Sequence, residues 1–334
     1  MVANVETMAY AGQTPWHGLG HKVGHDVTPE QMELVAGLDW NVNKVPFNNP
    51  VTGQQSEDYF VLVRDSDGKE LSPCGHSYVP VQNRQALGFF KKFTESGDMT
   101  LETAGSLDGG RRIFVLAKTS ESFAIKGKDK IDSYLFCYHP HIWGQSLKIM
   151  WTPIRVVCQN TLMQALDGKS AEFRMPHVQE FDANIQFKAE TALGLAHNKM
   201  SEFKEQSELL ASKEYTDKDL WKYWIALFQP SLKNENNPTP EMFSRTLEYL
   251  NNTIHTQPGA TLFKNTWWQA LNAVTYYIDH QSGRDRDATM TSVWLGPKGA
   301  LKRRALHSAL DMPEDNKIVS RGQKVPDSHY FLPL

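Results

Sequence analysis

The sequence has 334 residues, of which 40% are hydrophobic and 22% charged, and its formal net charge is −3. A chain of this kind can bury a sizeable core, and we expect two lobes. No run approaches the roughly 20 apolar residues of a membrane-spanning helix. The first residues lack a basic region followed by an apolar core, so no secretory signal is predicted. The 3 cysteines are too few and too scattered for a disulfide framework, which favours the cytoplasm.

The charges are segregated along the chain. Residues 1–75 carry a net charge of −6, and residues 76–175 carry +4. The net charge is −4 over residues 176–283 and +3 over residues 284–334. Two basic regions therefore alternate with two acidic ones. This pattern is compatible with a polyanion-binding face, and equally with an ordinary solvated surface.

The first half of the chain has the pattern of a mixed α+β fold. Residues 58–65, DYFVLVRD, alternate as a strand. The apolar residues of 81–93 have helical spacing that leaves Lys91 and Lys92 on the outer face. Two extended runs meet at a hairpin signal, Asp108-Gly109-Gly110. Further strands are predicted at residues 132–139 and 145–158, before a helix that begins near Asn160.

The second half is predicted to be helical from about residue 180. The expected helices cover residues 181–211, 216–228, 240–254 and 265–280. The last fifty residues are basic and are expected to be partly extended. The sequence thus predicts an α+β protein with a curved antiparallel sheet, helices on one face of it, and a mainly helical C-terminal lobe. We expect an acidic N-terminal segment packed on the core (1–75), a central α+β core (76–175), and the helical lobe with a basic tail (176–334).

The N-terminal stretch WHGLGHKVGHD has a histidine at every fourth position, namely His17, His21 and His25. A helix would align them, but the glycines between them disfavour a helix. We expect instead that Trp16 and His17 anchor an irregular segment against the sheet.

A second cluster comprises Cys137, His139, His141 and Cys158. The first three would share one strand face and could meet Cys158 on a neighbouring strand, which is the arrangement of a zinc site. Their spacing matches no common zinc motif, however, and buried cysteines usually pack as small hydrophobic residues. We therefore predict no metal and no other cofactor.

Cys158 is also a candidate nucleophile, because a helix N-terminus lowers the pKa of a thiol. Strand alternation places Ile154, Val156 and Cys158 together on an apolar face, so packing is the preferred interpretation. The usual phosphate-loop, nucleophile-elbow and dinucleotide motifs are absent from the sequence. No catalytic residue is predicted.

The polar residues at this strand-to-helix junction are Arg155, Gln159, Asn160 and Thr161. Asn160 or Thr161 could cap the helix, and its free amides together with Arg155 could hold a phosphate. The alternative is that Asn160 is simply a cap and that Arg155 pairs with a carboxylate.

Four blocks carry a resemblance to a known family: MAYAGQTPWHGLG, GRRIFVLAK, TPIRVVCQNTLMQAL and NTWWQALNAVTYYIDH. They resemble the phage- and plasmid-borne family called domain of unknown function 932, which implies a mobile-element protein without an assigned activity. Where that family commonly has a segment like SHDGS, this chain has YHPHIWGQS. This departure argues against a metal or catalytic role for His139 and His141.

Residues 80–167 are also similar in architecture to the core of single-strand annealing proteins such as Red-beta and RecT. That resemblance implies ring or helical oligomers that hold single-stranded DNA in a basic groove without catalysis. The candidate nucleic-acid-binding residues are Lys91, Lys92, Arg111, Arg112, Lys148, Arg155, Gln159, Asn160, Arg284, Arg286, Lys302, Arg303 and Arg304.

The preferred hypothesis is therefore a non-catalytic annealing or recombination protein of a phage or plasmid. Its expected partners are single-stranded DNA and further copies of itself in a ring or filament, without a membrane. One alternative is a phage protein that binds and inhibits a host defence protein through its acidic faces and helical lobe. A second alternative is a Cys- and His-dependent enzyme acting on nucleic acid.

Overall fold

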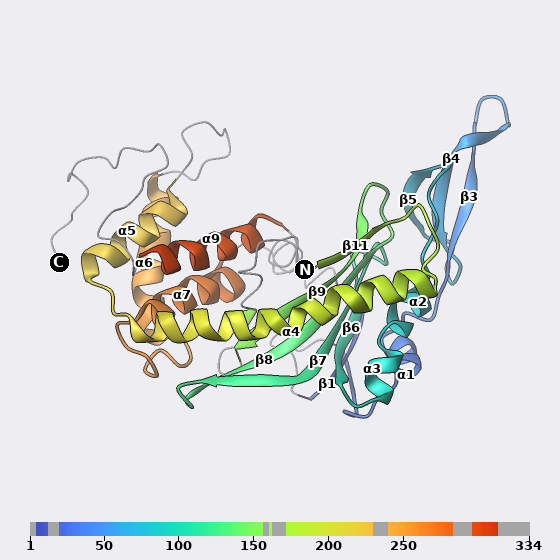
Figure 1. Ribbon diagram of the computed structural model, residues 1–334. Coiled ribbons are helices and arrows are strands. Elements are labelled where there is room, and N and C mark those ends of the chain that lie inside the picture. Colours follow the sequence, from blue (N-terminus) through green and yellow to red (C-terminus); the bar gives the residue numbers. More distant parts are fainter. Residues whose placement is uncertain are drawn as a thin grey trace.

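The computed structural model describes residues 5–12, 20–155, 160–161, 172–229, 240–282 and 296–312. Within these ranges a large sheet, a small sheet and a group of helices make up the molecule, as Figure 1 shows. The predicted α+β class is confirmed.

The large sheet has eight strands in the order β10-β9-β8-β7-β6-β1-β2, and β11 also pairs with β9. All neighbours are antiparallel except β1 and β2, which are parallel. β1 lies between β6 and β2 in this sheet. Part of the N-terminal segment expected to pack on the central core therefore belongs to the sheet of that core. The strands are β1 (Val5–Ala11), β2 (His21–Val23), β6 (Met99–Leu107), β7 (Arg112–Ile125), β8 (Asp129–Pro140), β9 (Ser146–Arg155), β10 (Asn160–Thr161) and β11 (Glu172–Pro176).

The predicted hairpin joins β6 to β7. Asp108, Gly109 and Gly110 all have positive φ, at 54°, 62° and 90°, a backbone conformation that favours glycine. A Cβ atom on Gly110 would lie 2.9 Å from Nη1 of Arg64. The turn therefore requires glycine both for its backbone and for the close approach of an arginine.

The small sheet is antiparallel and consists of β3 (Val42–Asn48), β4 (Gln55–Arg64) and β5 (Glu70–Gly75). The strand predicted at residues 58–65 is confirmed as part of β4. In Figure 1 the β3–β4 hairpin projects away from the rest of the molecule.

Helices cover one face of the large sheet (Figure 1). They are α1 (Pro29–Val35), α2 (Asn83–Gly88), α3 (Lys91–Glu95) and the first part of α4 (Ala183–Ser212). Apolar residues from these helices share one buried core with Val115 of β7 and Ile149 of β9. The core thus holds the helices on the sheet face to which these strand residues point.

The single helix predicted over residues 81–93 is wrong, because the chain forms two short helices, α2 and α3. Phe89 and Phe90 lie between them, and both side chains are buried. Neighbouring residues of one helix point about 100° apart. The break allows both rings to enter the same core, where they pack edge to face with centroids 5.3 Å apart.

The long helix predicted over residues 181–211 is confirmed as α4, with 30 residues, or about 45 Å. Its cap is Asp182, whose Oδ1 accepts a hydrogen bond from the amide of Ile185 at 2.9 Å. Ile185 belongs to the core of the large sheet, whereas Phe203 belongs to a second core in the helical lobe. One helix therefore connects the two cores.

The helical lobe contains α5 (Asp217–Phe228), α6 (Pro240–Thr256), α7 (Trp267–Tyr276), the π-helical turn η1 (Tyr277–Gln281) and α9 (Pro297–Asp311). Thr216 caps α5 as predicted. The β7–β8 hairpin reaches this lobe, because Ile125 and Ile131 lie in its core and Nε1 of Trp268 donates to Oδ2 of Asp129 at 2.8 Å.

Of the last fifty residues, which are basic and expected to be partly extended, residues 297–311 form the helix α9. Ala305, Leu306 and Ala309 of α9 pack into the helical core, so burial of an apolar stripe stabilises this helix. The tail residues 313–334 lie outside the described ranges. No described helix is long and apolar enough to span a bilayer.

Candidate nucleic-acid interface

Lys91 and Lys92 lie exposed on α3, on its outer face as predicted, and each faces a carboxylate. Nζ of Lys91 is 2.6 Å from Oε1 of Glu30, and Nζ of Lys92 is 2.9 Å from Oε2 of Glu190. The hydrogen bond from Lys91 lowers the pKa of Glu30. These ion pairs connect α3 to α1 and α4, so both lysines are already partly neutralised.

Arg111 and Arg112 lie at the β6–β7 turn and share one carboxylate. Arg112 forms an ion pair with Asp108, and Nη1 of Arg111 is 3.7 Å from Oδ2 of the same residue. Both arginine side chains are partly exposed. Because one carboxylate serves two guanidinium groups, this cluster of three residues keeps a net positive charge.

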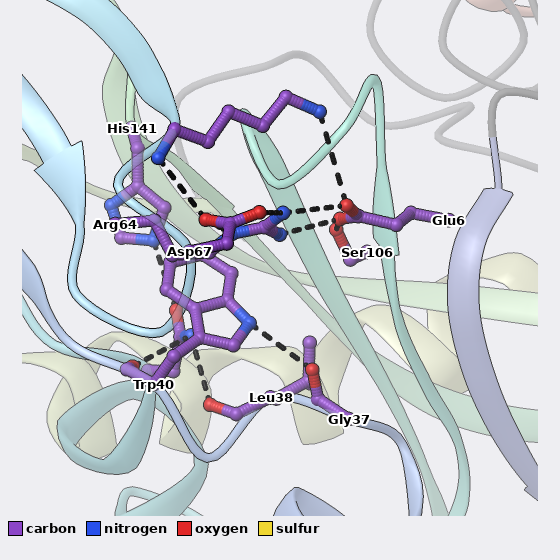
Figure 2. A network of polar contacts seen from close by, with 10 residues as sticks. Glu6, Gly37, Leu38, Trp40, Arg64, Asp67, Ser106 and His141 are labelled. Carbon is purple, nitrogen blue, oxygen red and sulfur yellow. Dashed lines mark hydrogen bonds and ion pairs between the residues drawn. The ribbon is translucent and has the colours of Figure 1, made fainter.

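Arg64, at the end of β4, is the centre of a polar network that joins the two sheets (Figure 2). Its Nη1 and Nη2 donate to the two oxygens of Glu6 on β1, each at 2.9 Å, and its Nε donates to Asp67. Ser106 of β6 also donates to Glu6, and the guanidinium lies over the ring of Trp40. With all these partners, Arg64 fixes the sheets to each other and has little capacity left for a ligand.

The pKa values in this network follow its contacts. Hydrogen bonds to Asp67 and Glu6 raise the pKa of Arg64, and the bond from Arg64 lowers the pKa of Asp67 to about 2. Burial opposes the ionisation of Glu6, but hydrogen bonds from Arg64 and Ser106 outweigh it and lower its pKa. The network therefore stays ionised in moderately acidic solution.

A row of cationic and aromatic side chains crosses the sheet face opposite to α4. Tyr138 of β8 pairs with Phe114 of β7 on one side and with Lys148 of β9 on the other, and Lys148 pairs in turn with Arg174 of β11. Phe114 and Tyr138 belong to a separate cluster from the one that contains α4, which places the row on the second face. Arg112, two residues before Phe114, points to the same face.

Lys148 and Arg174 are like charges at directly opposed positions of an antiparallel ladder. Such an arrangement destabilises a sheet. Lys148 is half-buried and Arg174 is exposed. Arg174 is absent from the predicted set of binding residues. The signal that could have found it is the short strand pattern of residues 172–176, which predicts a strand beside the central sheet.

Asn160 and Thr161 at the junction form a short strand, and the helix that either residue is predicted to cap lies outside the described residues. Both are residues of β10, where Asn160 pairs with Arg155 and Thr161 with Ile154 of β9. β11 pairs only with residues 146–150 on the edge of β9 that faces away from β8. The backbone groups of β9 after residue 150 therefore need another hydrogen-bonding partner on this edge, which β10 provides. The side chains of Arg155 and Asn160, all of Gln159, and the helix expected after residue 161 lie outside the described part.

The basic residues of the C-terminal part lie in a different region. Lys302 of α9 is 2% exposed and forms an ion pair with Asp279, so its assignment to a DNA groove is wrong. Arg303 is half-exposed and Arg304 is exposed on α9. Arg284 and Arg286 lie outside the described ranges. From the predicted set, the structure therefore brings together Arg111, Arg112 and Lys148 on the large sheet.

The described members of the predicted Cys and His cluster, Cys137, His139 and His141, are buried. Cys137 is completely buried on β8, and burial raises the pKa of its thiol to about 12. Cys74 of β5 is also buried, and burial raises its pKa as well. Neither thiol is therefore available as a thiolate nucleophile. Cys158 lies outside the described residues, as do Trp16 and His17.

His139 and His141 contact a third histidine that sequence reasoning missed. The ring centroids of His139 and His141 are 4.4 Å apart, and those of His139 and His177 are 5.6 Å apart. His177 is far from His139 and His141 in the sequence, so no motif spacing joins the three. It lies beside His139 because it follows β11, which pairs with β9. Across the described ranges, no set of three His, Cys, Asp or Glu side chains has the arrangement of a metal site.

A family model matches residues 70–294, and its description is domain of unknown function (DUF932). The chain belongs to this family. The resemblance drawn from the four sequence blocks is thereby confirmed. The DUF932 region extends from β5 through η1 and so includes the row on β7, β8, β9 and β11. Neither a curated protein nor a solved structure matches the chain.

Proposed function

We propose that this DUF932 protein is a non-catalytic DNA-binding protein of a phage or plasmid, which holds single-stranded DNA for annealing or recombination. The observation that carries the proposal is the opposed pair of Lys148 and Arg174 on the second face of the large sheet. Arg112 and Tyr138 continue the row across the neighbouring strands. The resemblance to annealing proteins that the sequence suggests points to the same function by analogy.

The chemistry of the row suits the backbone of a nucleic acid. Lysine and arginine neutralise phosphates independently of sequence, and this contact leaves the base edges free to pair. Tyr138 is too deeply buried to stack on a base, since only 5% of it is exposed. The contacts would therefore be to phosphates, which is what an annealing protein needs.

The size of the row favours an oligomer. Strands lie about 4.8 Å apart, so a row across four strands spans about 15 Å. Single-strand binding sites usually cover several nucleotides for each domain. Copies side by side in a ring or filament would extend the surface. We place this activity in the cytoplasm of the host cell, where DNA is accessible.

The test compares wild type with the double variant Lys148→Gln/Arg174→Gln. Fluorescence anisotropy with a labelled oligonucleotide, as a single strand and as a duplex, would be measured over a range of salt concentrations. Wild type should prefer the single strand. Loss of two phosphate contacts should reduce the slope of log K against log salt by about 1.4.

The matched control is Lys204→Gln/Lys218→Gln, which removes the same charge from exposed positions on α4 and α5. This control should bind like wild type. Absent or salt-insensitive binding by wild type would refute the proposal, as would an equal loss of affinity in the control.

A second candidate function is binding of a host protein, for instance to inhibit a defence system. The outer face of the small sheet favours it, because Val45 pairs with Val61, and Val45, Phe47 and Tyr59 share that face. Phe47 is 47% exposed and Tyr59 is 61% exposed, and such apolar patches often mark interfaces.

A pull-down from host lysate with wild type and with Phe47→Ser/Tyr59→Ser tests this alternative. A single stoichiometric partner that is lost with the variant would favour it. Recovery of the same proteins by both forms would exclude this face. A Cys- and His-dependent enzyme gains no support from the described residues, because Cys74 and Cys137 are buried and protonated.

A further inference from the structure

The segment Tyr78–Asn83, which links the small sheet to α2, runs across the three buried histidines. At its start, the amide of Val79 donates to the carbonyl oxygen of His177 at 2.8 Å. The ring of Tyr78 stacks on the His177 ring, with centroids 4.9 Å apart and an angle of 12°. The first contact of the segment is therefore with the residue that follows β11.

The rest of the segment meets the other two histidines in turn. Nε2 of His139 is 3.0 Å from the carbonyl oxygen of Val81, and Nε2 of His141 is 2.9 Å from Oδ1 of Asn83. The histidines belong to the large sheet or follow its strands directly, so they attach this connecting segment to that sheet.

These contacts fix the tautomers of two histidines. A carbonyl oxygen only accepts, so Nε2 of His139 carries the proton. Nδ2 of Asn83 donates to the carbonyl oxygens of Leu38 and Trp40, which orients the amide so that Oδ1 accepts from His141. In each neutral ring Nδ1 is therefore the unprotonated nitrogen, which can accept a proton. In the described structure neither Nδ1 atom has a hydrogen-bond partner.

The surroundings of the three rings oppose a positive charge. His139 and His141 are 1% and 0% exposed, and no described carboxylate forms an ion pair with any of the three rings. The titratable neighbours are Tyr78 on the segment and Cys74 on β5. Two cations, Lys44 and Arg64, contact residues around the rings.

These cations come from the small sheet. Lys44 of β3 donates to the carbonyl oxygens of His76 and Tyr78, and Arg64 of β4 lies over Trp40, whose ring packs on His141. From α2 the facing group is the neutral Asn83. Burial lowers the pKa of His141 to about 3 and that of His177 to about 4, and it holds the pKa of His139 well below its usual value.

We propose that His139, His141 and His177 form a proton-operated latch, which holds residues 78–83 on the large sheet when the rings are neutral and releases them on protonation. A proton on Nδ1 of His139 or His141 needs an acceptor, and the described residues place none beside either atom. Opening supplies water. This inference is independent of DNA binding.

The release is local, because a second attachment survives it. The Arg64 network also joins the small sheet to the large one, and its carboxylates have lowered pKa values. In moderately acidic solution the Glu6–Arg64 contact therefore stays ionised while the histidine contact opens. The small sheet then becomes able to pivot about Arg64.

Hydrogen–deuterium exchange of the full chain tests the latch. Peptides covering residues 76–85 would be followed at about pH 7.5 and about pH 4.5, with exchange times corrected for the intrinsic rate. We expect roughly a tenfold or greater loss of protection at the lower pH. Peptides of α7 should keep their protection, because α7 belongs to the other core.

The decisive variant is His139→Gln/His141→Gln/His177→Gln, since glutamine can donate the hydrogen bonds that the rings of His139 and His141 make but cannot take up the proton. It should remain closed at about pH 4.5, whereas the control His255→Gln, at an exposed position of α6, should open like wild type. Equal protection of wild type at both pH values, or opening of the glutamine variant, would overturn the proposal.

Should the triple variant not fold, nuclear magnetic resonance of wild type with labelled histidines provides the second measurement. His139 and His141 should be neutral Nε2–H tautomers near pH 6, and should begin to titrate only as the segment opens. Titration of these rings near the ordinary pKa of about 6.5 would contradict the latch.

Discussion

Lys302 of α9 and Asp279 of the π-helical turn η1 form an ion pair inside the helical lobe, where only 1% and 8% of their side chains are exposed. A buried pair of this kind contributes little net stability, but removal of one partner leaves an uncompensated charge. Because Lys302 is already committed to Asp279, it belongs to the fold of the lobe.

We predict that Lys302→Met lowers the free energy of unfolding by up to about 3–5 kcal/mol, because it removes the cation that contacts the buried carboxylate of Asp279. The double variant Lys302→Met/Asp279→Leu should cost clearly less than the single one. Urea unfolding followed by circular dichroism measures both. A double variant as unstable as the single would show that the charge is not the cause.

Trp268 provides a second prediction, because its indole nitrogen donates to the buried Asp129. Trp268→Phe should cost about 1–3 kcal/mol more than loss of packing alone, since it removes a hydrogen bond to a carboxylate. The matched control is Trp224→Phe, whose indole nitrogen is buried without a partner in the described structure. Equal destabilisation by the two changes, measured by urea unfolding, would contradict the role of the hydrogen bond.

Gly110 provides a third prediction. Gly110→Ala adds a Cβ atom 2.9 Å from Arg64 at a residue with φ of 90°, so both strain and displacement of Arg64 should destabilise the fold. Gly53→Ala is the control, because φ is 69° there and nothing lies within 4 Å of the added atom. Thermal unfolding should show a clearly larger loss for Gly110→Ala, by about 1 kcal/mol or more. Similar losses would mean that only the backbone conformation matters.

The fourth prediction concerns acid stability. The three buried histidines have lowered pKa values in the folded protein, so the unfolded chain binds more protons below its pKa of about 6.5. Their stabilising contribution is complete above that pH and is lost as the pH falls. For His177 alone the loss should reach about 3 kcal/mol near pH 4.

Urea midpoints measured between about pH 7.5 and about pH 4.5 check this prediction. They should fall with decreasing pH in wild type and fall less in His177→Gln. A midpoint that stays constant or rises would contradict the assignment of a neutral, buried His177.

Features with local sequence signals could be predicted. The hairpin at Asp108-Gly109-Gly110, the cap at Thr216 and the helix of residues 181–211 all depend on neighbouring residues, and each is confirmed. The interpretation of Cys137 as a buried cysteine packed like a small hydrophobic residue is confirmed as well.

Features that depend on distant strands could not be predicted. Lys148 and Arg174 become neighbours only through the pairing of β9 with β11, and His177 joins His139 through the same pairing. Asn160 belongs to a strand through its pairing with Arg155 at the edge of β9 beyond β11. Contacts of this kind have no signal in the neighbouring sequence.

The placement of α4 has a consequence for how the molecule unfolds. Ile185 lies in one core and Phe203 in the other, on a single 30-residue helix. Melting of either core would deprive half of this helix of its packing, and helices in water depend on packing for their stability. The β7–β8 hairpin bridges the same two cores. The two lobes should therefore unfold in one cooperative transition, although each has an apolar interior of its own.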